Sequence, residues 1–121
     1  MGELNKRMYK AGLIDGFMIG MALVNDEKEL NKYGNTTTNA LVKVTEQDVK
    51  VYVKKYLKKK VLDNEDYTDA LFAGFSLHAC LYEMSEVERI GIFGARDVRC
   101  IIEQYNPYWI IGKTYKEYVM A

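Results

Sequence analysis

Residues that interrupt or cross-link a fold are scarce in this sequence. Its 121 residues include one proline, Pro107, so the chain can be helical along most of its length, because proline interrupts helices in their interior. The two cysteines, Cys80 and Cys100, are too few for a disulfide framework, and we expect free thiols. Basic and acidic residues balance at 17 each, which excludes a net field drawing the whole protein to nucleic acid or a membrane.

A long hydrophobic run is also missing. The most apolar stretch, residues 11–24, contains Asp15 and is shorter than the roughly 20 apolar residues that a transmembrane helix needs. A helix that is apolar on nearly every side but too short to span a bilayer is typical of a core. Because no secretory signal precedes the cysteines, we expect a cytoplasmic protein without membrane association.

The composition that remains is that of a folded globule. Hydrophobic residues make up 49% of the chain and charged residues 28%, which argues against disorder. A chain of this length can close one core without disulfides or metals, so we expect a single helical domain over residues 1–121.

Two stretches of the chain resemble each other 58 residues apart, because residues 9–23 match residues 67–81. A second match, 49 residues apart, relates residues 48–56 to residues 97–105. Amphipathic helices share apolar spacing, so chance similarity is the alternative explanation. The identical pairs in the longer match are Tyr9 and Tyr67, Leu13 and Leu71, Gly16 and Gly74, Phe17 and Phe75, and Leu23 and Leu81.

We interpret these matches as an all-α fold of two tandem helix–loop–helix repeats, packed as a pseudo-twofold helical bundle. The first repeat covers about residues 4–61 and the second about residues 64–105. A tail over residues 106–121 is expected to add one or two short helical turns.

Helix-start signals agree with this division. Thr45 is a candidate N-cap, with Asp48 placed to reach back to the free amide groups, and Asp63 or Asn64 can cap the helix that follows. Residues 25–44 are polar and rich in turn formers, and we expect a loop there. From residue 46 one apolar stripe continues over Val49, Val53, Tyr56, Leu57 and Val61.

Glycines lie inside the most hydrophobic predicted helix, although each costs about 1 kcal/mol of helix stability relative to alanine. Gly12, Gly16 and Gly20 are four residues apart and form a groove without side chains, and Ala70 and Gly74 occupy the matching positions of the second copy. Such grooves let helix backbones approach closely. We therefore predict that the two helices cross at Gly16 and Gly74.

Catalytic and metal-binding patterns are weak. His78 and Cys80 are two residues apart and point to different sides of a helix, and one histidine with two separated cysteines cannot supply a tetrahedral metal site. His78 is better explained as a core histidine. Asp15 is compatible with a functional carboxylate or with a surface or interface position. No cofactor loop is present, so we expect a non-enzymatic protein without metal or cofactor.

Lysines dominate one face of the predicted helix over residues 46–61. They could grip phosphates of DNA or RNA, with Tyr52 or Tyr56 stacking on bases. We favour a solvated or protein-binding face, offset by Glu65, Asp66 and Asp69, because residues 97–105 do not repeat the lysines and the chain has no net positive charge. The lysines expected to bind a partner are Lys50, Lys54, Lys55, Lys58 and Lys59, with Lys43 and Lys60 nearby.

The C-terminal residues are unusually aromatic. Tyrosine and tryptophan are the anchors most enriched in interface hot spots, but they also form lids over open bundle ends. The residues we assign to partner binding here are Tyr108, Trp109, Tyr115 and Tyr118.

The spacing of tyrosine, glycine and phenylalanine over residues 9–20 is similar to stretches in small accessory proteins of bacteriophages and other mobile elements. Within that group the chain resembles inhibitors of bacterial immunity of the anti-CRISPR type. The resemblance implies a stoichiometric binder of a host protein or ribonucleoprotein complex, acting in the bacterial cytoplasm. Self-association, as a homodimer or a small scaffold, is a separate class to test. The alternative is a small helical regulator that binds DNA or RNA through the lysine face.

Overall fold

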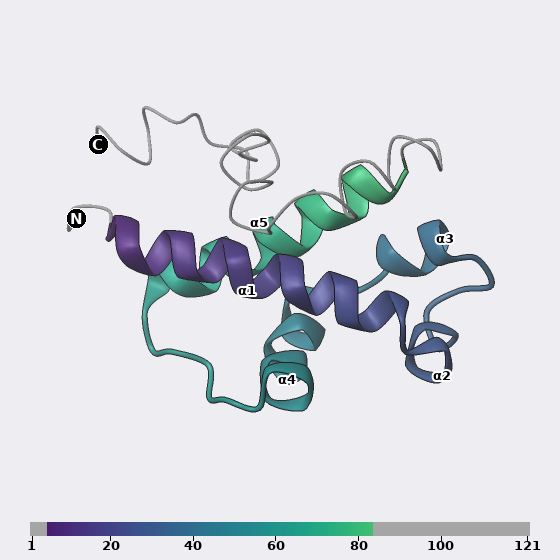
Figure 1. The fold of residues 1–121 in the computed structure, drawn as a ribbon, viewed down its shortest axis with the longest axis horizontal. Coiled ribbons are helices and arrows are strands. Elements are labelled where there is room, and N and C mark those ends of the chain that lie inside the picture. The colour runs from purple at the N-terminus through teal and green to yellow at the C-terminus, as the bar shows by residue number, and fades with distance from the viewer. Residues whose placement is uncertain (1–4, 84–121) are drawn as a thin grey trace.

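The computed structural model describes residues 5–83, which form five helices and no strand (Figure 1). The all-α expectation is confirmed for this part of the chain, in which no helix is long and apolar enough to cross a membrane. The predicted helix at 97–105 and the aromatic tail lie outside the described residues. The helices are α1 (Lys6–Val24), α2 (Glu27–Leu30), α3 (Thr37–Leu41), α4 (Glu46–Leu57) and α5 (Glu65–Tyr82).

Each helix begins at a polar side chain that accepts a hydrogen bond from a backbone amide three residues later. At Thr45 a full capping box forms, in which Asp48 Oδ2 accepts from the Thr45 amide at 3.1 Å while Thr45 Oγ1 accepts from the Asp48 amide at 3.2 Å. The predicted cap at Thr45 is therefore confirmed, and of the two candidates Asp63 and Asn64 the structure selects Asn64. The five capping residues are Asn5, Asp26, Thr36, Thr45 and Asn64.

The two long helices, α1 and α5, run in the same direction and lie across each other near their middles (Figure 1). A Cβ atom on Gly16 would overlap the carbonyl oxygen of Leu71 and lie 2.8 Å from the amide nitrogen of Phe75. A Cβ on Gly74 would overlap the carbonyl oxygen of Leu13. The backbones approach this closely because both positions lack side chains.

The remaining small positions extend this contact in order along both helices. Gly12 lies against the backbone of Tyr67 and the Cβ of Ala70, and Gly20 lies against the ring of His78. The glycine spacing in the sequence therefore marks the face of α1 that α5 covers.

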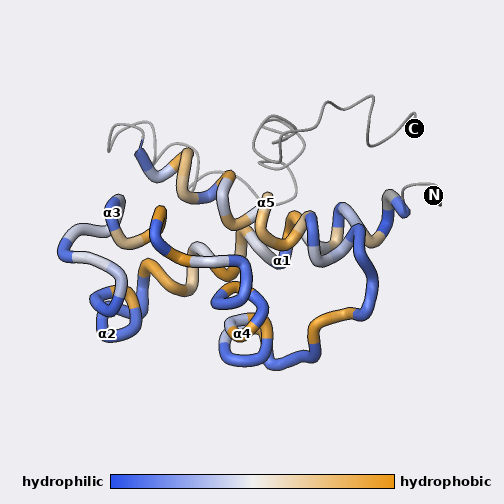
Figure 2. The backbone as a smooth tube through the Cα atoms, turned by 180° about the vertical axis from the view of Figure 1, so that it is seen from behind, coloured by the Kyte–Doolittle hydropathy of each residue, from blue (hydrophilic) through white to orange (hydrophobic). Residues whose placement is uncertain are grey.

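The core forms where α4 packs beneath this pair. Val49 and Val53 of α4 are fully buried and belong to one cluster with Leu23, Tyr67 and Phe75 of the long helices. Figure 2 shows hydrophobic residues along α1 and α5, whereas α2 and α4 are largely hydrophilic. The short helices therefore bury one face each and present a polar face outward.

Two predictions about the segment before α4 and about the end of α4 are wrong. Residues 25–44 are not a loop, because Asp26 and Thr36 cap the short helices α2 and α3, which bury Leu30 and Leu41. The helix that begins after Thr45 does not reach Val61. It ends at Leu57, and Lys58 follows in a left-handed conformation with φ 57°.

Candidate interaction surface on α4

The lysines of α4 lie on a face fixed by the helix period. Successive residues are about 100° apart, so the buried Val49, Tyr52 and Val53 define the inner side of the helix. Val51 and Lys54 point the opposite way and are exposed. The outward side is completed by Gln47 and Lys58, which are also exposed, and bordered by the half-buried Lys50.

Lys55 lies at the other border of that side and pairs with α2. Its Nζ is 3.2 Å from Glu29 Oε2 and 4.0 Å from Asp26 Oδ2. Glu29 also accepts from Lys32 at 2.9 Å. The hydrogen bond from Lys32 lowers the pKa of Glu29 most, burial opposes it, and the hydrogen bonds from Lys55 and Tyr52 bring the pKa to about 2. Lys55 is therefore part of the contact between α4 and α2.

Tyr52 and Tyr56, the candidates for base stacking, are engaged in the same contact. The Tyr52 hydroxyl donates to Glu29 Oε1 at 3.0 Å and lies 2.6 Å from the hydroxyl of Tyr33, which accordingly donates to it. The Tyr56 hydroxyl donates to Asp26 Oδ2 at 2.7 Å. Burial, reinforced by these hydrogen bonds, raises the pKa of both Tyr52 and Tyr56 above its usual range. Tyr52 is buried, and the half-buried Tyr56, whose ring lies 5.2 Å from that of Tyr52, is on the inner side of α4 and not on the lysine side.

Lys59 is likewise used within the fold. It follows α4 and forms an ion pair with Asp15 of α1, whose carboxylate also accepts from the Tyr67 hydroxyl at 2.6 Å. The side chains of Asp15 and Tyr67 are both buried. The burial of Tyr67 has the larger effect in raising its pKa, and its hydrogen bond to Asp15 raises the pKa further. Asp15 is therefore a buried carboxylate with a tyrosine donor and a lysine counter-charge, and it joins three segments of the chain.

The predicted lysine set therefore divides into two groups. Lys55 and Lys59 pair with carboxylates that precede them in the sequence, at Asp26, Glu29 and Asp15, rather than with the acidic residues 65, 66 and 69. The others have no ion pair within residues 5–83. We call their surface the α4 face, which consists of Gln47, Lys50, Val51, Lys54 and Lys58.

Val51 distinguishes the α4 face from a purely solvated lysine surface. It is 65% exposed on the outward side of α4, and hydrophobic side chains this large are exposed at few other described positions. Val51 was not among the residues expected to bind a partner, although the helix period places it on the outward side, next to Lys54. The aromatic residues also expected to bind a partner, Tyr108, Trp109, Tyr115 and Tyr118, lie outside the described residues.

The groups weighed for chemistry do not converge. His78 is buried against Gly20, with its ring 5.2 Å from that of Phe17 and 5.9 Å from that of Tyr82, and desolvation lowers its pKa to about 4. Cys80 is a free, half-buried thiol whose pKa burial raises. Within residues 5–83 no group of three metal-ligating side chains comes together.

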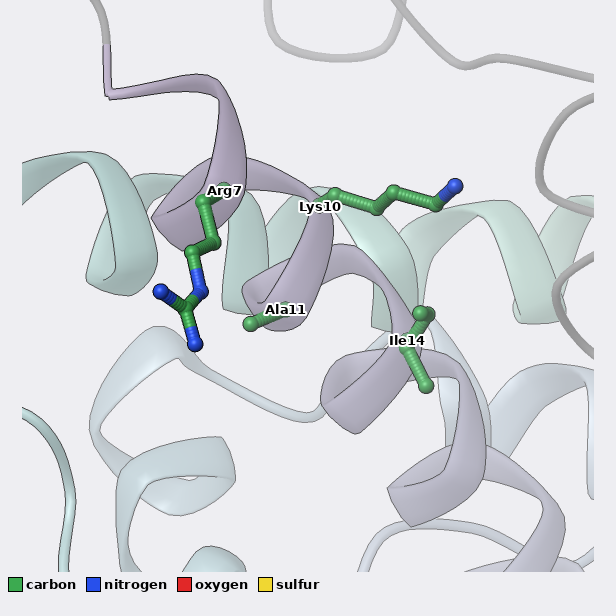
Figure 3. Close-up of a pocket in the computed structure, with 4 residues that line it drawn as sticks. All are labelled: Arg7, Lys10, Ala11 and Ile14. Carbon is green, nitrogen blue, oxygen red and sulfur yellow. The ribbon is translucent and has the colours of Figure 1, made fainter.

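A shallow hollow of about 290 Å³ lies on α1 beside Arg7, Lys10, Ala11 and Ile14. Figure 3 shows the Arg7 and Lys10 side chains extending in different directions from the helix. The two cationic groups therefore do not form a binding pair for one anion.

Comparisons with protein-family models, with curated proteins and with solved structures found no match to this chain.

Proposed function

We propose that this protein is a non-enzymatic inhibitor or adaptor that acts by occupying a macromolecular partner with the α4 face. The observation that carries the proposal is the division of the lysines. Lys55 and Lys59 serve internal ion pairs, whereas Lys50, Lys54 and Lys58 lie beside an exposed valine and pair with no described carboxylate. The proposal includes the phage accessory type, with a host protein or ribonucleoprotein complex as partner.

The energetics of exposed lysines support this use of the face. An exposed ion pair contributes only about 0–1 kcal/mol to folding, so Lys50, Lys54 and Lys58 can be replaced with little effect on stability. Charges at the rim of an interface act mainly on the rate of association and on the choice of partner. The α4 face can therefore be altered without disturbing the core contacts of Val49 and Val53.

We further infer that the fold arose from an internal duplication with pseudo-twofold packing. The support is reciprocal, since Gly16 lies against Leu71 while Gly74 lies against Leu13, and these residues are matched pairs 58 positions apart. Gly12 and Gly20 likewise lie against Ala70 and His78, their own counterparts. On this proposal the glycines belong to the shared fold, and the α4 face is a feature of one copy.

The test of the binding function is a pull-down from bacterial lysate with the tagged full chain and a charge-reversed variant, K50E/K54E/K58E. The proposal expects a protein partner that the parent chain retains and the variant loses. The matched control is R7E/K10E/K28E, which changes the net charge by the same amount as K50E/K54E/K58E but on α1 and α2. This control should retain the partner. A partner that K50E/K54E/K58E retains at parental yield would contradict the assignment of this face.

Nucleic-acid binding is the second candidate, because three lysines on one helix face can neutralise phosphates. A regulator of this kind must bind nonspecific duplex DNA with an affinity that falls steeply between two salt concentrations and is lost in K50E/K54E/K58E. Binding that is independent of salt, or retained in that variant, excludes it.

A further inference from the structure

The α4 face also indicates the kind of partner it fits, an inference that rests on the proposed function. We propose that it recognises an acidic amphipathic helix of a protein partner, in which carboxylates lie beside a small apolar stripe. Recognition would pair the partner's carboxylates with Lys50, Lys54 and Lys58 and its apolar stripe with Val51.

The spacing of the lysines matches that of carboxylates on a second helix. Lys50, Lys54 and Lys58 follow one another at intervals of four residues, which corresponds to about 6 Å along a helix. Glutamates four residues apart on a second helix repeat at the same interval, so the two rows can remain in register over two turns. Lys58 ends the row, because its left-handed conformation ends α4.

Val51 is 65% exposed beside the row of lysines. A valine side chain offers no hydrogen-bond donor to a phosphate, and contacts with nucleic-acid backbones are made by polar and charged groups. Against an amphipathic helix the same side chain loses water and gains apolar contact, which favours association. The exposed valine of the face therefore suits a protein better than a nucleic acid.

The α4 face has no aromatic side chain on which a base could stack. The tyrosines next to the lysines, Tyr52 and Tyr56, donate their hydroxyl protons to Glu29 and Asp26 and pack toward α2. Single-stranded nucleic acids are bound through aromatic platforms beside cationic grooves, and this surface lacks the platform. The equal numbers of basic and acidic residues also remove any overall attraction to a polyanion.

The test uses two synthetic peptides of about 20 residues, long enough to populate a helix, with acetylated and amidated ends. Both have the same composition. The in-phase peptide places its glutamates and leucines on one face, and the scattered peptide distributes them around the helix. Each is titrated into the ¹⁵N-labelled full chain at 0.15 M salt, and amide shifts at residues 47–58 report binding.

We expect the in-phase peptide to bind about fivefold more tightly than the scattered peptide, the gain available from a few exposed ion pairs and one apolar contact. Lys54→Glu should remove this preference. Val51→Ser should weaken the in-phase peptide about threefold, since part of the apolar contact is lost. The matched control, Val42→Ser, changes a valine of equal exposure (64%) outside α4 and should have no effect.

Equal affinity for the two peptides would overturn the inference, as would an unchanged preference in Lys54→Glu. Tighter, Lys54-dependent binding of duplex DNA than of the in-phase peptide would overturn it in favour of nucleic acid. These outcomes are distinct from failure of the proposed function. A partner lost from the K50E/K54E/K58E pull-down, combined with equal peptide affinities, overturns only the choice of an acidic helix.

Discussion

The crossing of α1 and α5 makes a sharp prediction about alanine. In an ordinary helix interior, replacing glycine with alanine stabilises the helix by about 1 kcal/mol. Here Gly16→Ala and Gly74→Ala should destabilise the protein, because each new methyl group would meet backbone atoms of the other helix, which cannot rotate away. The sign of the effect therefore separates a close backbone contact from a solvent-exposed glycine.

The magnitude follows from the displacement that the methyl group forces. Moving the Gly16 Cβ from 2.8 Å to an ordinary 3.4 Å from the Phe75 nitrogen requires 0.6 Å, and the overlap with the Leu71 oxygen requires more. Gaps of 0.5–1 Å forfeit roughly a quarter to a half of each dispersion contact. Because Leu13 and Phe17 are fully packed at the crossing, the net loss should be about 3 kcal/mol, at the upper end of the range for overpacked cores.

The assay is urea unfolding followed by far-ultraviolet circular dichroism, with the free energy of unfolding extrapolated to water. Gly34→Ala is the control, because the added Cβ atom would come no closer than 3.1 Å to another atom, the Ala40 nitrogen. This substitution should change the free energy of unfolding by less than about 1 kcal/mol. Gly20→Ala should be intermediate, because it meets the His78 side chain instead of backbone. A Gly16→Ala or Gly74→Ala protein as stable as the parent would refute the close contact of α1 with α5.

Three further predictions concern single groups. Burial lowers the pKa of His78 from 6.5 to about 4, so the unfolded chain binds a proton at a higher pH than the folded chain does. The free energy of unfolding should therefore fall by about 2–3 kcal/mol between pH 6.5 and 4.5. Urea melts should show this fall in the parent but not in His78→Asn. Lys59→Met should lower the free energy of unfolding by about 1–2 kcal/mol because it leaves the buried Asp15 without its cation. The control, Lys54→Met, should lower it by less than about 0.5 kcal/mol. Equal unfolding midpoints in the two variants would contradict the internal role of Lys59. Thr45→Ala should cost about 1 kcal/mol by removing the capping box of α4, and thermal melts that match the parent would show that this cap does not limit stability.

Helix boundaries were predictable where the stabilising contacts are local. The cap at Thr45 was identified correctly, and that of α5 was narrowed to Asp63 or Asn64, because a capping side chain bonds to an amide only three residues away. The caps at Asp26 and Thr36 carry the same signal and were overlooked among polar neighbours, so α2 and α3 were taken for a loop. The end of α4 at Leu57 was missed because the apolar stripe continues to Val61 beyond the left-handed Lys58.

The sequence by itself determined the helical character of residues 5–83, the buried stripe of α4 and the glycine positions at which α1 meets α5, because these depend on helix period and side-chain size. Only the tertiary structure decided which lysines are available to a partner. Lys55 and Lys59 resemble Lys54 and Lys58 in the sequence, yet they pair with Glu29 and Asp15. Such pairs depend on packing between distant segments, which brings together charges whose sequence separation gives no sign of their proximity in space.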